Sequence, residues 1–259
     1  MKSRTDGKNI PLSNLIWIMI WVTVFVAFIL LDLYFRIFHN EKNIFETVSL
    51  GSHSFEISVL ENGNFIGVKI LKLCAIILNL IYALKRSHKD RLLIAALAFT
   101  LLADTFFTFN PVSARAVFIF CFAQYFHSLR FSKNKRLSLA RATVAVLFLI
   151  FGYVSKLSNI YAFAYVYTFL IIGNIHLSYR NLEKTVKEKT SEKAYLKASA
   201  FAFAGFILFY FCDVNIALTF YCTSGILPEY LGHYLAFIAW FFYYPSQVLI
   251  INSSLLHKE

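Results

Sequence analysis

Residues 101–110 read LLADTFFTFN, and residues 207–216 read ILFYFCDVNI. Each run is apolar enough to lie within a membrane, and each carries a single aspartate in its interior. A charge at membrane depth is costly, so such an aspartate usually faces the interior of a helix bundle and has a function. The two stretches therefore predict a membrane-embedded helical fold that holds two carboxyl groups.

The composition of the whole chain supports a membrane protein. Of its 259 residues, 59% are hydrophobic and only 15% are charged, and its mean hydropathy is +0.63. A soluble domain of this length needs more polar surface. Since a membrane-spanning helix takes about 20 residues, the apolar stretches predict an all-α integral membrane protein, one domain of eight transmembrane helices over residues 1–259. These helices are expected at approximately 15–35, 66–85, 92–110, 112–131, 137–156, 159–179, 196–221 and 231–255.

Lysine and arginine residues are concentrated in every second connection between the predicted helices. They precede the first helix and join the second to the third, the fourth to the fifth and the sixth to the seventh. Positively charged connections stay on the cytoplasmic side, so both termini are expected there. The net charge of +11 then faces anionic lipid head groups, and nucleic acid is not an expected partner. The expected location is the cell membrane, as a multi-pass protein of a bacterial plasma membrane.

The connection between the first two predicted helices, residues 36–65, is longer than the others. It carries four glutamates and two glycines: Glu41, Glu46, Glu56, Glu61, Gly51 and Gly63. A surface loop and a short hairpin are both compatible with this composition.

Three ionisable side chains are expected at one depth in the membrane. Asp104, Asp213 and Lys72 lie about six, eight and seven residues from the outer ends of their helices, which at about 1.5 Å per residue is on the order of 10 Å. The three side chains could therefore meet in one polar pocket.

Helical spacing adds further polar groups to this pocket. Thr100, Asp104 and Thr108 follow each other at intervals of four residues and share one helix face, and Tyr243 and Gln247 are spaced in the same way. A purely structural interpretation is also open, in which Lys72 and the aspartates form a buried ion-pair network that holds the helices together.

The order of several short motifs resembles the YhhN-like family, the lysoplasmalogenases. The motifs are Lys72 before a long apolar helix, LLAD at 101–104, FYFCDVNIAL at 209–218 and YYPSQVLI at 243–250. The resemblance covers about residues 66 to 252 and implies eight helices in the membrane. By this resemblance Lys72, Asp104 and Asp213 take the positions of the family's lysine and two aspartates, and the terminal motif is matched by Tyr243, Tyr244 and Gln247.

The chain departs from the family pattern beside these positions. Leu73 replaces a proline, Ala103 a glycine, Cys212 a serine, Gln124 a histidine and His127 a tyrosine. Both carboxyl groups are kept, although several of their neighbours in sequence are not.

The resemblance implies an enzyme that hydrolyses the vinyl ether bond of a lysoplasmalogen-like lysophospholipid to a fatty aldehyde and a glycerophospho-alcohol. A vinyl ether yields to acid, so the chemistry asks for one carboxylic acid and one carboxylate, as in glycosidases. Asp104 and Asp213 would fill these roles in either order, with one of them held protonated. Substrate contacts are expected from Lys72, Thr108, Tyr243, Tyr244 and Gln247.

No cofactor and no metal are predicted, because no spacing of histidines typical of a metal site occurs. The expected partner is a membrane lipid or lysophospholipid. Two other classes of function stay open. A small polytopic transporter also carries Asp and Lys in mid-membrane, and a catalytically silent member would serve as a lipid-binding membrane protein.

Overall fold

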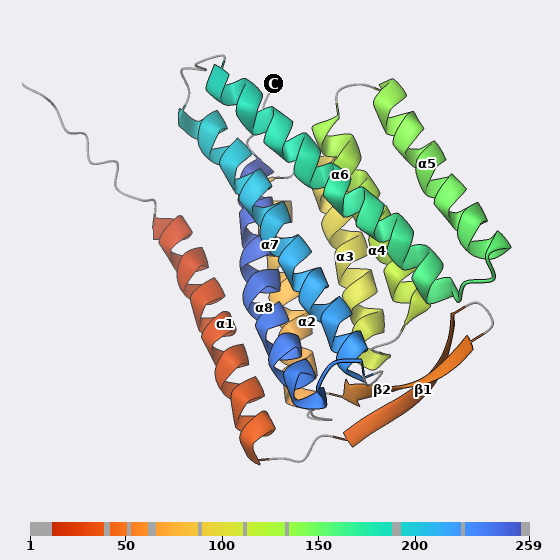
Figure 1. Ribbon diagram of the computed structural model, residues 1–259. Coiled ribbons are helices and arrows are strands. Elements are labelled where there is room, and N and C mark those ends of the chain that lie inside the picture. Colours follow the sequence, from red (N-terminus) through yellow and green to blue (C-terminus); the bar gives the residue numbers. More distant parts are fainter. Residues whose placement is uncertain are drawn as a thin grey trace, which may run out of the picture.

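The computed structural model describes residues 12–38, 42–50, 53–61, 66–87, 90–110, 113–132, 135–187, 193–223 and 226–254. The described helices are α1 (Leu12–Phe38), α2 (Ile66–Arg86), α3 (Arg91–Phe109), α4 (Ala114–Phe131), α5 (Lys135–Val154), α6 (Asn159–Lys187), α7 (Lys193–Thr223) and α8 (Glu229–Asn252). Between α1 and α2 lie the strands β1 (Lys42–Leu50) and β2 (His53–Glu61). Figure 1 shows a bundle of roughly antiparallel helices with the two strands across one end.

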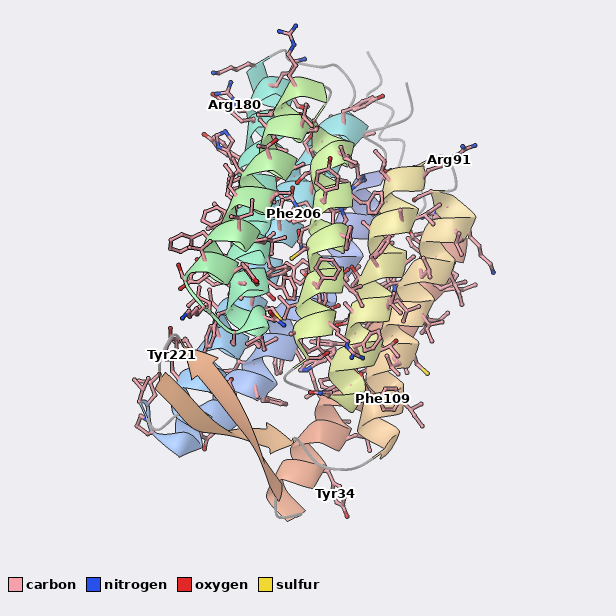
Figure 2. All side chains as sticks on the ribbon, turned by 90° about the vertical axis from the view of Figure 1, so that its right-hand side faces the viewer. Tyr34, Arg91, Phe109, Arg180, Phe206 and Tyr221 are labelled. Carbon is pink, nitrogen blue, oxygen red and sulfur yellow. The ribbon has the colours of Figure 1, made fainter. Side chains whose placement is uncertain are left out.

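The two ends of the bundle differ in character. We call the end near the strands, with Phe109 and Tyr221, the hairpin end, and the opposite end, with Arg91 and Arg180, the far end (Figure 2). The depth of a residue in the bundle is measured from the hairpin end and so does not depend on how the protein is oriented in a membrane.

Several helices are suited to a membrane by length and composition. Five of the described helices contain a long, apolar stretch that could cross a membrane: Arg91–Phe109, Arg136–Val154, Asn159–Lys187, Lys193–Thr219 and Tyr234–Asn252. The apolar part of α1, Ile16–Leu31, is shorter. The chain is thus a multi-pass membrane protein by its helices, while the predicted number of eight spans and the cytoplasmic termini stay predictions.

The prediction of an all-α chain is incomplete. β1 and β2 pair antiparallel, from Lys42 opposite Glu61 to Leu50 opposite His53, and β2 contacts α7. Both strands are rich in β-branched and aromatic residues, which suits a paired strand, and β2 alternates them with polar residues over Ser54–Val59. Of the two structures left open for residues 36–65, the hairpin is the one observed.

Each predicted helix coincides with an observed one, but the ends differ. The largest difference is in α6, which was expected to end at residue 179 and continues to Lys187. The apolar stretch ends where predicted, and the helix goes on as a polar segment in which Lys187 donates to Glu183, four residues earlier, at 2.6 Å.

The most extensive helix packing occurs between α7 and α8, and Gly205 lies where these helices approach closely. A Cβ added at Gly205 would lie 2.8 Å from Cγ1 of Ile250 and 3.1 Å from the carbonyl oxygen of Ser246. Small residues at such crossings let two helix backbones approach closely, which is a main source of helix association in membranes.

Replacing Gly205 by valine is expected to lower the stability of the bundle by about 1–3 kcal/mol, because the added methyl groups force α7 and α8 apart. The measurement is the thermal melting temperature of the purified protein in detergent. Ala204→Val is the matched control, since Ala204 is exposed beside Gly205. Equal melting temperatures of the two variants would contradict the prediction.

A buried ion pair joins three helices at the far end. Nε of Arg130 on α4 donates to Oδ2 of Asp90 at 2.7 Å, and its Nη1 donates to Oγ of Ser253 at 2.9 Å. Oδ1 of Asp90 accepts from the backbone N–H of Leu93 at 3.0 Å and so caps the start of α3. One guanidinium group therefore fixes the start of α3, the end of α4 and the end of α8.

Candidate functional site

The first carboxyl group of the site is that of Asp104. It lies on α3, five residues before Phe109 and so about 8 Å from the hairpin end of that helix. Its Oδ2 accepts a hydrogen bond from the hydroxyl of Tyr243 on α8. Tyr243 is buried, while Asp104 is only half-buried. The hydroxyl of Tyr243 therefore orients the carboxyl group of Asp104, which remains partly accessible.

The second carboxyl group, that of Asp213 on α7, is held in a similar way. The hydroxyl of Tyr167 on α6 donates to Oδ2 of Asp213 at 2.7 Å. Asp213 is also half-buried. Each aspartate thus has a tyrosine partner from a different helix.

The two pairs adjoin each other through aromatic rings. Phe209 lies 5.5 Å from Tyr243 and 6.1 Å from Phe120, and Phe120 lies 5.9 Å from Tyr167, all measured between ring centroids. Asp104 and Asp213 are also near enough to each other to interact electrostatically. We call Asp104, Asp213, Tyr167 and Tyr243 the carboxylate site.

Lys72 of α2 provides the positive charge beside this site. Its Nζ lies 4.6 Å from the ring centroid of Trp240 and 5.4 Å from that of Phe28. Such cation–π contacts favour an ammonium group in an apolar environment. The ring of Trp240 in turn lies 5.2 Å from that of Tyr243, and Lys72 is near enough to Asp104 to interact with it electrostatically. The structure thus brings together Lys72, Asp104, Asp213 and Tyr243.

Three further residues that the sequence suggested for substrate contacts lie differently. The hydroxyl of Thr108 donates to the carbonyl oxygen of Asp104 at 2.7 Å and so is engaged by its own helix. Tyr244 stacks on Phe25 of α1, with centroids 5.3 Å apart and rings 6° from parallel. Gln247 is buried one turn farther from the hairpin end than Tyr243. None of these three makes a hydrogen bond to a carboxyl group of the site among the described contacts.

Tyr167 is the site residue that the sequence did not reveal. It lies in the run IYAFAYVYTF together with Tyr161 and Tyr165. All three are tyrosines in an apolar helix, so their spacing gives no reason to prefer one. Only the packing of α6 against α7 shows which hydroxyl meets a carboxyl group.

Most of the chain matches a known family. The model of the YhhN family matches residues 65–254, which include every member of the carboxylate site and Lys72. No curated protein matches the sequence, and no solved structure does. The match covers well over half of the 259 residues and agrees with the resemblance seen in the motifs. The chain therefore belongs to the YhhN family.

Proposed function

We propose that the protein hydrolyses the vinyl ether bond of a lysoplasmalogen-like lysophospholipid. The products are a fatty aldehyde and a glycerophospho-alcohol. The observation that carries this proposal is the pair of adjoining carboxyl groups, each oriented by a tyrosine hydroxyl. Hydrolysis of a vinyl ether needs a proton donor and a proton acceptor on either side of one bond. Membership of the YhhN family, which includes lysoplasmalogenases, supports the same reaction.

The surroundings of the two carboxyl groups favour different roles. The ammonium group of Lys72 acts on Asp104 and stabilises a negative charge there. Asp213 accepts from a tyrosine hydroxyl just as Asp104 does, but its charged neighbour is the carboxyl group of Asp104, and a negative charge there disfavours a second one. We therefore assign the proton donor to Asp213 and the proton acceptor to Asp104.

The reaction then proceeds in three steps. Asp213 donates its proton to the vinyl carbon that does not carry the oxygen, and the other vinyl carbon becomes an oxocarbenium ion. Water attacks this carbon while Asp104 takes a proton from the water, which gives a hemiacetal. As the hemiacetal breaks, Asp104 returns the proton to the departing ether oxygen and Asp213 accepts the proton of the new hydroxyl group. Both carboxyl groups are then ready for the next turnover.

The position of Lys72 suits the other end of the substrate. An ammonium group held over aromatic rings keeps its charge and can pair with a phosphate oxygen. We assign Lys72 to the head-group phosphate of the lysophospholipid, with the alkenyl chain lying against the apolar helices.

We further propose that all eight helices span the membrane and that the far end faces the cytoplasm. The basic residues support this orientation, since Arg91 and Arg180, which belong to two of the lysine- and arginine-rich connections, both lie at the far end (Figure 2). The carboxylate site, nearer the hairpin end, would then receive its substrate from the outer half of the membrane.

Aldehyde release by the purified protein in detergent tests the proposed reaction. A vinyl-ether lysophospholipid is expected to yield aldehyde, whereas the matching lipids with a saturated ether or an ester link are not. In D2O the aldehyde, trapped by reduction, should carry one deuterium at carbon 2. In H2¹⁸O the glycerophospho-alcohol should stay unlabelled, because water attacks the vinyl carbon.

The absence of aldehyde from a folded sample would reject the hydrolase. Two alternatives would then take its place, a small transporter and a catalytically silent lipid-binding protein. Flux in proteoliposomes that depends on a proton gradient would favour the transporter, and lipid binding without flux would favour the silent member.

Replacing Tyr167 by phenylalanine is expected to lower kcat about tenfold, since a hydrogen bond to a charged or reacting carboxyl group is worth about 1.5–3 kcal/mol. Tyr167 is a positioning residue, so KM should change little. Tyr165→Phe is the matched control, because Tyr165 lies two residues away and is 51% exposed. Equal kcat values for both variants would show that Tyr167 does not position Asp213.

A further inference from the structure

A second polar region lies deeper in the bundle than the carboxylate site. Moving toward the far end, Thr100 precedes Asp104 by four residues on α3, and Gln247 follows Tyr243 by four residues on α8. These spacings keep the side chains on one helix face, one turn apart. We call the following six residues the polar layer: Asn79, Thr100, Gln124, His127, Asn174 and Gln247. All six are buried, with 0–2% of their surface exposed.

Ring contacts fix the depth of this layer. Phe209 contacts Tyr243 of the carboxylate site, with centroids 5.5 Å apart. Phe206, about one turn farther from the hairpin end on α7, contacts His127 at 5.2 Å. Phe206 lies near the middle of the bundle (Figure 2). His127, and Thr100 and Gln247 one turn from Asp104 and Tyr243, therefore lie between the carboxylate site and the Arg130–Asp90 ion pair.

One side of the layer is held by hydrogen bonds within the protein. Nδ2 of Asn174 donates to Oε1 and to the backbone oxygen of Gln124, both at 2.9 Å. Oγ of Ser128 donates to Oδ1 of Asn174 at 2.6 Å. These bonds join α4 to α6 and fix the amide of Gln124 in place.

Several other polar atoms of the layer have no such partner. Within the described ranges, six buried atoms of the layer make no hydrogen bond to the protein: Nδ2 and Oδ1 of Asn79, Oγ1 of Thr100, Nε2 of Gln124, Nδ1 of His127 and Nε2 of Gln247. A buried polar group without a partner costs about 1–3 kcal/mol, and such groups are rare in native proteins. Their concentration at one depth indicates a ligand that both donates and accepts hydrogen bonds. Water meets this requirement, and buried water typically makes about three such bonds.

We propose that the polar layer binds a cluster of ordered water molecules and supplies the carboxylate site with the water that hydrolysis consumes. This inference rests on the proposed function. Each turnover uses one water molecule, whose oxygen bonds to the vinyl carbon and whose proton passes to Asp104. A lipid chain seated against the helices covers the approach from the membrane, whereas Thr100 and Gln247 adjoin Asp104 and Tyr243 from within. A water molecule moving one turn along α3 and α8 therefore reaches the reacting carbon.

The test combines labelling of bound water with kinetics. A short X-ray pulse converts bound water to hydroxyl radicals, which oxidise adjacent side chains. His127 and Phe206 are buried, so bulk water does not reach them. In the wild type both are expected to be oxidised. In Thr100→Val with Gln247→Met their oxidation should fall several-fold, and kcat should fall about tenfold with little change in KM.

Thr105→Val is the matched control. Its hydroxyl donates to the carbonyl oxygen of Leu101 at 2.8 Å on the same helix, so its loss leaves no layer atom changed. Labelling and kcat of this variant should equal those of the wild type. A melting curve of each variant adds a second measurement, because replacing a partnerless buried hydroxyl by a methyl group would raise stability if the layer were dry.

The outcomes separate this inference from the proposed function. Unlabelled His127 and Phe206 in the wild type, or a stabilised Thr100→Val variant, would overturn the water layer whatever the activity. Labelling that falls in the double variant without a change in kcat would overturn the supply role. Labelling in a wild-type protein that releases no aldehyde would reject the hydrolase, and the supply role with it, while the water cluster itself would stand.

Discussion

Replacing Asp213 by asparagine is expected to lower kcat for the vinyl-ether lysophospholipid by roughly a thousandfold, within the range for loss of a general acid. The amide has nearly the same shape and can still accept the hydroxyl of Tyr167, which lies 2.7 Å from the carboxyl oxygen. It has no acidic proton to give to the vinyl carbon. The loss should therefore appear in kcat, measured as aldehyde release at saturating lipid, and much less in KM.

Asp104→Asn is expected to lose a similar factor for a different reason. This variant lacks the group that takes the proton from water, so azide, an anion that attacks the oxocarbenium carbon without losing a proton, should restore part of the rate of lipid consumption, with the α-azido ether as the product in place of the aldehyde. Azide should not restore the Asp213→Asn variant, because there the oxocarbenium ion does not form. Rescue of Asp213→Asn instead would reverse the two assigned roles.

Glu183→Gln is the matched control for both variants. It removes a carboxylate at the exposed end of α6, where Glu183 pairs with Lys187. Its turnover should equal that of the wild type. Either aspartate variant that is correctly folded and turns over at the wild-type rate would contradict the assigned acid–base chemistry.

The depth of a charged residue along a membrane helix could be predicted from the sequence. The apolar stretches give the approximate bounds of each helix, and counting residues from these bounds places Lys72, Asp104 and Asp213 at one level. The structure brings the three together, with electrostatic interaction between neighbouring members. Because the rise per residue is nearly constant in a helix, the depth of a residue follows from its position along the helix and does not depend on packing.

The rotation and local bonding of side chains could not be predicted in the same way. Thr108 shares a face with Asp104, as its spacing predicts, yet its hydroxyl donates to the backbone of its own helix. Threonine commonly makes this bond when a helix lies in an apolar environment. Tyr244 follows Tyr243 directly and so points to a different side of α8, where it stacks on Phe25. A motif that names both tyrosines does not show which of them meets the carboxyl group.

Contacts between the ends of helices could not be predicted from the sequence either. Asp90 and Arg130 lie at helix ends, where charged residues usually face water or lipid head groups. In the structure their side chains are 4% and 0% exposed. Residues separated by forty positions meet here only because α3 and α4 pack side by side.

Replacing Asp90 by asparagine is expected to lower the stability of the protein by about 3–5 kcal/mol, because the charge of Arg130 then remains buried without its counter-charge. Asparagine caps a helix as well as aspartate does, so the cap of α3 through Leu93 is retained and the effect isolates the ion pair. At this chain length the loss corresponds to a fall in melting temperature of about 10 °C. Thermal melting in detergent measures it.

A double variant separates the ion pair from the packing around it. Asp90→Asn combined with Arg130→Met leaves no buried charge and keeps most of the arginine's apolar volume, so it should melt at a higher temperature than Asp90→Asn alone. Glu183→Gln, which breaks an exposed pair, should shift stability by less than about 1 kcal/mol. If the double variant melted below the single one, the hydrogen bond from Arg130 to Ser253, at 2.9 Å, would stabilise the far end more than the ion pair does. Arg130 would then stabilise the contact between α4 and α8 through this hydrogen bond. Asp90 would reduce the free energy that is needed to bury the charge of Arg130.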